Sequence, residues 1–300
     1  MGDPALDAPI TLDQLRVFLA VVEEGSFSKA ARRLRRVQSA VSYSIANLER
    51  LLSVELFDRS GRMPILTEEG SALLADARAV CERMDQLHAR ARAIAEGVEP
   101  RLSLAVDMLF PMPKLVEALR ELSERYPLVP LHLRTEALGA VASLVLDGTC
   151  QIGIGVDVEE RTRELVHAPL LAVEMVPVAA PSHPLARRGG PLIADDVRDA
   201  VQIVLTDRST LTEGKDHGVY SARTWRVADL DAKRALLLSG FGWGQMPDHR
   251  AEQDLEAGRL VQLTLRDVPS SSYHVPLHAM HRKADPPGPA GRWLLDRLRG

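Results

Sequence analysis

The chain has 300 residues, of which 46% are hydrophobic, so it is long enough to bury a sizeable core in two domains. Its formal net charge is −4 and its only cysteines are Cys81 and Cys150, which excludes a strongly basic chain and a disulfide-rich secreted domain. No apolar run approaches the roughly 18 residues of a membrane span, and the acidic start lacks an apolar signal segment. We therefore expect a cytoplasmic protein with two buried thiols, a redox pair being the alternative.

Residues 1–10 are expected to form a loose tail, and Thr11 and Gly25 have the residue types that begin and end a helix. Two short helices are predicted next, over 28–34 with Ser28 as the cap and over 38–52. The apolar residues of the second are spaced 4, 3 and 4 apart, at Val41, Ile45, Leu48 and Leu52. That spacing gives one buried face and leaves the polar opening turn free for base edges or phosphates. This is the arrangement of a helix-turn-helix.

Positive charge is concentrated in the same stretch. Between Ser28 and Arg62 eight basic residues stand against three acidic ones, a local net charge of +5. Phosphate binding requires such a patch on an otherwise acidic chain. The alternative is the solvated surface of an ordinary helical bundle, and the helical spacing favours DNA binding over it. Short strands are then expected over 54–57 and 63–66, joined by a hairpin with two arginines at its tip.

The segment from Leu12 to Leu74 resembles the N-terminal winged helix-turn-helix of the LysR-type transcriptional regulators. The matching residues are FLAVVEEGSFSKAARRL, QSAVS with IANLE, LFDR and LTEEG. The resemblance implies that DNA is contacted by Ser28, Lys29, Arg32, Arg33, Arg35, Arg36, Gln38, Ser39, Ala40, Ser42, Tyr43, Arg59 and Arg62. Two positions depart from the family pattern. Val37 stands where a capping Ser or Thr is usual, and Ser53 where Gly is usual.

A long helix is predicted from Thr67 to about Glu96. Two sets of apolar side chains each recur every seven residues. One set is Leu73, Val80, Leu87 and Ile94, and the other is Ala77, Met84 and Ala91. A two-position seam of this kind is typical of a helix that pairs with another helix, so we predict dimerisation through it. A dimer doubles the base pairs contacted on an inverted repeat. The alternative is a long helix packed on its own domain.

After a break at 97–100, apolar strands and amphipathic helices alternate, which predicts a parallel α/β sheet. Strands are expected over 102–106, 129–134, 151–156, 165–171, 175–180, 201–205 and 275–283, and helices over 114–125, 137–146, 229–239 and 289–298. LLLSGFGWGQMP followed by DLEAGRLVQL resembles the co-inducer-binding domain of the same family, itself similar to periplasmic binding proteins.

The predicted fold class is therefore α+β multidomain. The expected domains are an N-terminal winged helix-turn-helix over 1–68, a long linker or dimerisation helix over 67–97, and a C-terminal two-lobed α/β periplasmic-binding-protein-like effector-binding domain over 100–300. Its lobe I is expected over about 101–167 and 272–300, and its lobe II over about 168–271.

Open parallel sheets bind ligands at the carboxyl ends of their strands. The candidates in this chain are Asp107, Met108, Leu138, Thr206, Asp207, Phe241 and Trp243. A carboxylate at Asp107 would repel an anion by roughly 1–4 kcal/mol, so we predict a neutral or cationic effector, or none. The alternatives are that Asp107 only caps a helix and that the apolar candidates are plain core.

Signatures of enzymes are missing. The GFGWG of residues 240–244 is not a dinucleotide fingerprint, and Pro276 interrupts the histidines His274, His278 and His281 that could otherwise bind metal. No cofactor, metal or catalytic residue is expected.

The predicted function is a sequence-specific DNA-binding transcriptional regulator that binds inverted-repeat promoter sites and is modulated by a small-molecule effector between its lobes. Expected partners are double-stranded DNA, the effector and a second copy of the chain, with RNA polymerase as a further candidate and no membrane. The resemblance implies a homotetramer. The alternatives are a ligand-independent DNA-binding protein whose C-terminal domain serves oligomerisation only, and a small-molecule-binding protein whose N-terminal helices contact protein.

Overall fold

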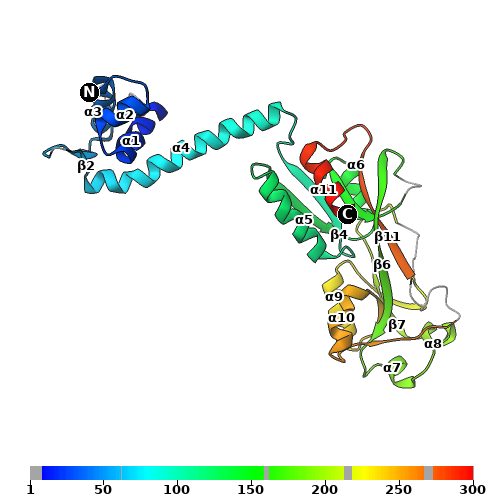
Figure 1. Ribbon diagram of the computed structural model, residues 1–300. Helices are drawn as coiled ribbons and strands as arrows, with labels where there is room; N and C mark the ends of the chain where they lie inside the picture. The colour runs from blue at the N-terminus through cyan, green and yellow to red at the C-terminus, as the bar shows by residue number, and fades with distance from the viewer. Residues whose placement is uncertain (1–8, 62, 159–161, 213–217, 267–272, 300) are drawn as a thin grey trace, which may run out of the picture. The chain divides into compact units, whose positions relative to one another are not determined.

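The structure is a computed structural model that describes residues 9–61, 63–158, 162–212, 218–266 and 273–299. The chain divides into two compact units, Met1–Ala93 and Ile94–Gly300. They are called the N-terminal and the C-terminal unit below, and each is described by itself (Figure 1).

The N-terminal unit is a bundle of helices followed by a small hairpin. Its elements are α1 (Leu12–Glu24), α2 (Phe27–Arg33), α3 (Gln38–Leu52), β1 (Phe57–Asp58), β2 (Ile65–Leu66) and α4 (Glu68–Ala95), the last of which crosses the unit boundary. Thr11 caps α1 in a capping box with Gln14, and Gly25 ends it with a left-handed backbone, as predicted. Val41, Ile45 and Leu48 of α3 are fully buried against α1 and α2, so the spacing predicted the correct face.

Two predictions for this unit were wrong in detail. Helix α2 begins at Phe27 and not at Ser28, because the carbonyl of Ser26 accepts the first helical hydrogen bond, from the amide of Ala30 at 2.9 Å. The hairpin strands are only two residues long each. The carboxylate of Glu49 accepts the amides of Leu56 and Phe57, so these groups bond to a side chain and not to a longer strand.

The C-terminal unit is built on one mixed sheet with the strand order β4-β3-β5-β11-β6-β9-β7-β8, and β10 pairs with β6. Its strands are β3 (Leu102–Asp107), β4 (Leu131–Glu136), β5 (Ile152–Val156), β6 (Leu165–Ala179), β7 (Val201–Leu205), β8 (Arg223–Val227), β9 (Trp243–Pro247), β10 (Val261–Gln262) and β11 (Tyr273–Arg282). Its helices are α5 (Met112–Arg125), α6 (Gly139–Leu146), α7 (Pro184–Arg188), α8 (Ala194–Arg198), α9 (Leu230–Leu238), α10 (Asp248–Glu256) and α11 (Pro289–Arg299).

Two lobes arise because separate hydrophobic cores cover the two ends of this sheet. In lobe I, α5 and α11 pack on the face that carries Leu104 and Val106, and α6 packs on the face of Ala105. In lobe II, α9 and α10 cover the face of Met246, while α7 and α8 cover the face of Trp243. The antiparallel pair β6 and β11 runs through both lobes and joins them (Figure 1).

The alternation predicted from the sequence is confirmed within the lobes, where β3 pairs in parallel with β4 and β5, and β7 pairs in parallel with β8 and β9. The two strands expected over 165–171 and 175–180 are one strand, β6. It was divided wrongly because the polar Glu174 interrupts the apolar run, although it stays in register with His274 of β11. Within the described residues, no helix is long and apolar enough to cross a membrane.

Candidate functional site

The first turn of α3 presents its side chains to solvent. Gln38, Ser39, Ala40 and Tyr43 are exposed, Tyr43 to 73%, and Ser42 is half-buried. Val37 is the N-cap residue and supplies no side-chain hydrogen bond, so amides at the start of α3 have no side-chain cap. The buried face of α3 holds this exposed turn in place, and the resulting surface can contact a groove of DNA.

Two turns next to α3 use left-handed backbone without glycine. Arg35, between α2 and α3, has a φ of 56°, and Ser53, at the end of α3, has a φ of 58°. Ser53 therefore adopts a left-handed conformation at a position where the family usually has glycine. Such residues cost on the order of 1 kcal/mol each, so the surrounding core imposes both turns.

The basic side chains of this surface fall into two groups. Arg33 bonds Glu23 at 2.5 Å, and Arg36 bonds Asp13 at 2.6 Å. Arg59 lies over the ring of Phe27 and bonds Glu49 at 2.6 Å. In the part of the chain that the structure describes, ion pairs are absent at Lys29, Arg32 and Arg35. Ser28 is exposed, and Arg62 lies outside the described residues.

The predicted seam of α4 has two parts. Leu73 and Ala77 pack into the core of the N-terminal unit, so there the alternative of a helix packed on its own domain holds. Further along, Val80, Leu87 and Ile94 are 50%, 58% and 44% exposed, with Met84 half-buried and Ala91 exposed. Apolar side chains at this spacing and exposure form an unpaired helix face.

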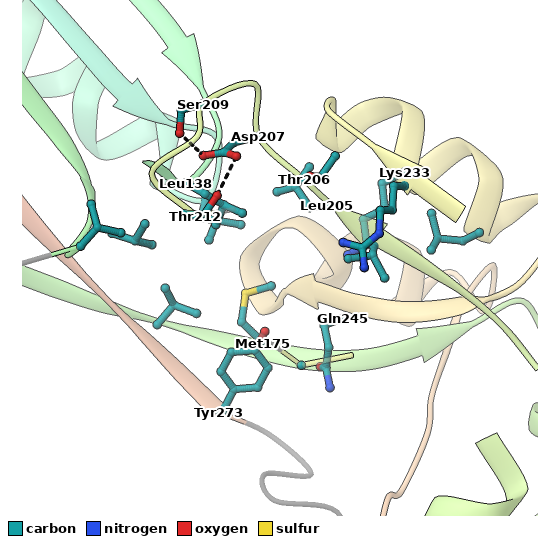
Figure 2. A pocket seen from close by; sticks show the side chains of 18 of the residues that line it. Leu138, Met175, Leu205, Thr206, Asp207, Ser209, Thr212, Lys233, Gln245 and Tyr273 are labelled. Atoms are coloured by element: carbon teal, nitrogen blue, oxygen red, sulfur yellow. Dashed lines mark hydrogen bonds between the residues drawn. The ribbon is translucent and has the colours of Figure 1, made fainter. Parts of the chain in front are cut away.

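A cavity of about 640 Å³ lies where the two lobes of the C-terminal unit meet. It is lined from lobe I by Leu109, Leu138 and Val156, from the joining strands by Met175 and Tyr273, and from lobe II by residues of β7, α9 and β9. Figure 2 shows Asp207 in its wall, bonded to the hydroxyls of Ser209 and Thr212 at 2.7 Å each. A cavity of this size can hold a small molecule.

Three of the predicted effector residues line this cavity, namely Leu138, Thr206 and Asp207. The others lie elsewhere. Trp243 is fully buried in the core of lobe II, where its indole donates to the hydroxyl of Ser221, as the plain-core alternative expected. Phe241 is on the surface beside Trp225, and Met108 packs against a lobe II core. For Phe241 and Trp243, proximity to the ends of strands was a poor guide because the side chain points away from the cavity.

Asp107 is fully buried and is not among the described residues that line the cavity. Its two oxygens accept the amides of Leu109 at 2.9 Å and Leu138 at 2.7 Å. Burial raises the pKa of Asp107 to about 7, although the two amide hydrogen bonds lower it. Helix α5 begins only at Met112, so Asp107 does not cap it. Its hydrogen bond to the amide of Leu138 holds that residue, whose φ of 51° is strained, at the cavity wall.

The sequence prediction missed several polar residues of the cavity, above all Lys233 in α9 and Gln245 in β9. Lys233 is 4% exposed, and burial lowers the pKa of its ammonium group to about 7. One signal was available. Lys233 lies between Leu230 and Leu237 at helical spacing, so a charged residue stands on the apolar face of a predicted helix.

Two family models account for almost the whole chain. The bacterial regulatory helix-turn-helix protein, lysR family, matches residues 12–71, and the LysR substrate binding domain matches residues 95–300. The chain belongs to the LysR-type family of DNA-binding transcriptional regulators. Such regulators carry an effector-binding domain, and the cavity between the lobes lies in that domain of this LysR-type regulator. The alternative of a C-terminal domain that serves oligomerisation only is not favoured.

Full-length relatives agree with this assignment. The transcriptional regulator AceR of Acinetobacter baumannii is 30% identical over 292 residues, with 97% of each chain covered. YhaJ of Escherichia coli is 31% identical, with 98% of this chain and 97% of YhaJ covered. An OxyR mutant from Corynebacterium glutamicum has a similar fold, with a TM-score of 0.57 at 20% identity, 98% of this chain and 93% of that chain covered.

Both cysteines of this LysR-type regulator are free and buried. Burial raises the pKa of the Cys81 and Cys150 thiols, which disfavours the reactive thiolate. The described residues include no group of three or more His, Cys, Asp or Glu side chains placed to hold a metal ion.

Proposed function

We propose that the exposed opening turn of α3 enters the major groove of an operator and determines which sequence is preferred. Gln38, Ser39, Ser42 and Tyr43 offer amide and hydroxyl groups to base edges, and Ala40 offers a methyl group. The observation that carries this proposal is the exposure of these side chains on a helix whose opposite face is fully buried. Because the core fixes α3, its contacts can be specific.

The surrounding cations are proposed to bind the DNA backbone. Lys29, Arg32 and Arg35 are available without breaking an ion pair, and Ser28 adds a hydroxyl. Arg33, Arg36 and Arg59 are proposed to exchange their carboxylates for phosphates, and the proposal extends to Arg62 from its place in the sequence. These contacts set affinity and register and do not read sequence.

The exposed part of the α4 seam, from Val80 to Ile94, is proposed to pair with the same helix of a second copy. Pairing removes these apolar side chains from water. It also brings together the α3 helices of two copies, one for each half-site of an inverted repeat. The C-terminal unit is proposed to extend the dimer to a homotetramer. Its exposed aromatic pair, Trp225 on the edge strand β8 and Phe241, supports a second self-contact.

A small molecule is proposed to bind in the cavity between the lobes and to shift the population of arrangements of the DNA-binding units. This role is binding and not catalysis, and RNA polymerase is proposed as the partner that responds at the promoter. A regulator of a bacterial promoter acts where the DNA is, so we place it in the cytoplasm.

The test is the salt dependence of DNA binding by the full chain. With about six phosphate contacts per dimer, the log-log slope of affinity against salt is expected near −5. Arg32→Ala should weaken binding to every sequence and flatten the slope by about 1.8, because each dimer loses two phosphate contacts. Gln38→Ala should instead change the preferred sequence in a binding selection on random DNA.

Lys114→Ala, which is in the C-terminal unit, is the control and should alter neither measurement. A flat salt slope, or a Gln38→Ala variant that loses affinity without any change of preference, would refute the proposed role of α3.

A further inference from the structure

The side chain of Lys233 is buried against a neighbouring strand, and not only against its own helix. It projects from the second turn of α9 toward β9, where Gly244 leaves room for its stem. A Cβ on Gly244 would lie 3.3 Å from the Cε of Lys233 and 2.6 Å from the carbonyl oxygen of Ile203. The missing side chain of Gly244 therefore makes the space in which an ammonium group is held at the cavity wall.

Among the described residues, the ammonium group of Lys233 has no counter-charge. The side chain of Lys233 forms neither a hydrogen bond nor an ion pair within the described ranges, and burial alone accounts for the direction of its pKa shift. Proteins pair or neutralise buried charges, because a bare ammonium group loses its hydration on burial. A buried cation beside a cavity can regain that interaction from an anion that enters the cavity.

The other charged side chains of the cavity are Asp157, Asp207 and Arg226, together with Arg208, which is exposed. Asp207 is held by two hydroxyls, and Asp157 lies 3.3 Å from His167. Arg226 has interactions of its own. A second unsatisfied group is Gln245, which is 4% exposed and whose amide nitrogen and oxygen both lack a partner among the described residues. Figure 2 shows Lys233 and Gln245 on different elements of the cavity wall.

Asp107 does not oppose an anion in the way that the sequence suggested. Its oxygens are turned onto two backbone amides, and its side chain lies behind the cavity lining. The repulsion expected from Asp107 is therefore not directed into the cavity. Asp157 and Asp207 line other parts of the wall, and the charged group of α9 that lines the cavity is the cation Lys233.

Resting on the proposed role of the cavity as an effector site, we propose that Lys233 anchors the carboxylate of a small monocarboxylic effector with an apolar body. One unpaired ammonium group matches one negative charge, whereas a phosphate carries nearly two. Leu109, Leu138, Val156 and Met175 supply the apolar wall for the body of the ligand. The free amide of Gln245 can bond a further polar group in either direction.

The experiment measures binding to the full-length protein by calorimetry for two matched sets of probes. They are benzoate, benzamide and benzylamine, and hexanoate, hexanamide and hexylamine. A carboxylate of at least one set is expected to bind more tightly than its amide and amine. Lys233→Met should weaken that carboxylate by about tenfold to a hundredfold, the value of one hydrogen bond to a charged group, and should leave the amide unchanged.

Lys114→Met is the matched control and should bind all probes like the wild type. Lys233→Gln serves as a second variant if Lys233→Met does not fold, which far-UV circular dichroism reports. Carboxylates that bind no better than their amides and amines, or that bind Lys233→Met as tightly as the wild type, would overturn the proposal.

Failure of this inference can be told from failure of the effector site itself. If amides or amines bind and change the affinity for operator DNA, the cavity is an effector site and only the charge preference is wrong. If a carboxylate binds through Lys233 and operator binding does not respond, the anion site stands and the regulatory role of the cavity fails.

Discussion

The two units place their charged groups differently. In the N-terminal unit each described ion pair includes an exposed arginine, as at Arg36 with Asp13 and Arg33 with Glu23. The C-terminal unit also has exposed pairs, such as Arg299 with Asp296, but in addition Asp107, Lys233 and Asp254 are at least 96% buried. Asp254 accepts hydrogen bonds from Arg234 at 2.5 Å and Arg259 at 2.7 Å, and Lys233 has no partner among the described residues.

The difference follows from what each unit binds. Exposed pairs are worth about 0–1 kcal/mol because water screens them, so an arginine can leave its carboxylate for a phosphate at little cost. Buried charges lose their hydration and remain only where hydrogen bonds or a ligand replace it. The N-terminal surface is therefore suited to a large polyanion, and the C-terminal interior to a small molecule that brings its own polar group.

The largest effect is expected at Asp254. Asp254→Ala leaves two arginines without their shared carboxylate and should lower the free energy of unfolding by about 3 kcal/mol. This is the low end of the range for buried pairs, since both arginines are partly exposed. All three tryptophans lie in the C-terminal unit, so denaturant titration followed by Trp fluorescence measures it. Asp296→Ala, which breaks an exposed pair with Arg299, is the control and should change little.

The same variant predicts a pH dependence. Burial by itself raises the pKa of Asp254, but the hydrogen bonds from Arg234 and Arg259 outweigh burial and hold the pKa below its usual value. The stabilisation is therefore complete above the unfolded pKa of about 3.9 and is lost as the pH falls through the folded pKa. The stability difference between the wild type and Asp254→Ala should shrink in acid. A difference that stays constant would contradict the assigned cause.

A smaller effect is expected when a charge is placed on the exposed α4 seam. Leu87→Glu should leave the monomer folded, because Leu87 is 58% exposed, but would bury two like charges in a dimer. Loss of the dimer removes the gain from two linked half-sites, so operator affinity should fall on the order of a hundredfold. Analytical ultracentrifugation measures the dimer and fluorescence anisotropy the affinity.

Gln86→Glu adds the same charge one residue away, outside the seam, and is the matched control. If Leu87→Glu were still dimeric with unchanged operator affinity, pairing through α4 would be wrong.

The contrast between the units also explains what could be predicted. Residues of the DNA-binding surface stand close together in sequence, so helical spacing and caps were enough to predict α1, α3 and the exposed turn after Val37. The cavity gathers residues as distant in sequence as Leu109 and Tyr273, and their side-chain directions depend on the register of β6 with β11. Neighbouring residues there point to opposite faces, and Trp243 was misplaced for that reason.

Which single charged side chains are buried could not be predicted from the sequence either. Asp107 looked like a group facing a ligand because it ends a strand, and only the positions of two backbone amides show that it is already satisfied. The heptad spacing includes Leu73 and Ala77, but both residues pack into the N-terminal core. Their packing depends on the direction in which α4 extends from that core. Periodicity predicts which side chains share a face, and not which partner covers that face.

The smallest effect is expected at the exposed pair of Arg36 and Asp13. Asp13→Asn should change the free energy of unfolding by less than about 1 kcal/mol, since the pair is exposed and α1 loses only one acidic residue near its start. The side-chain hydrogen bond from Arg36 lowers the pKa of Asp13, which marks this contact as the one that a phosphate must replace. With the Asp13 carboxylate neutralised, Arg36 reaches its phosphate without breaking an ion pair, so affinity for all DNA sequences should rise. The log-log salt slope depends on the number of phosphates neutralised and should stay as in the wild type. Asp85→Asn, which frees Arg16 on α1, is the control and should not change the affinity. An unchanged affinity for Asp13→Asn would mean that Arg36 does not contact phosphate.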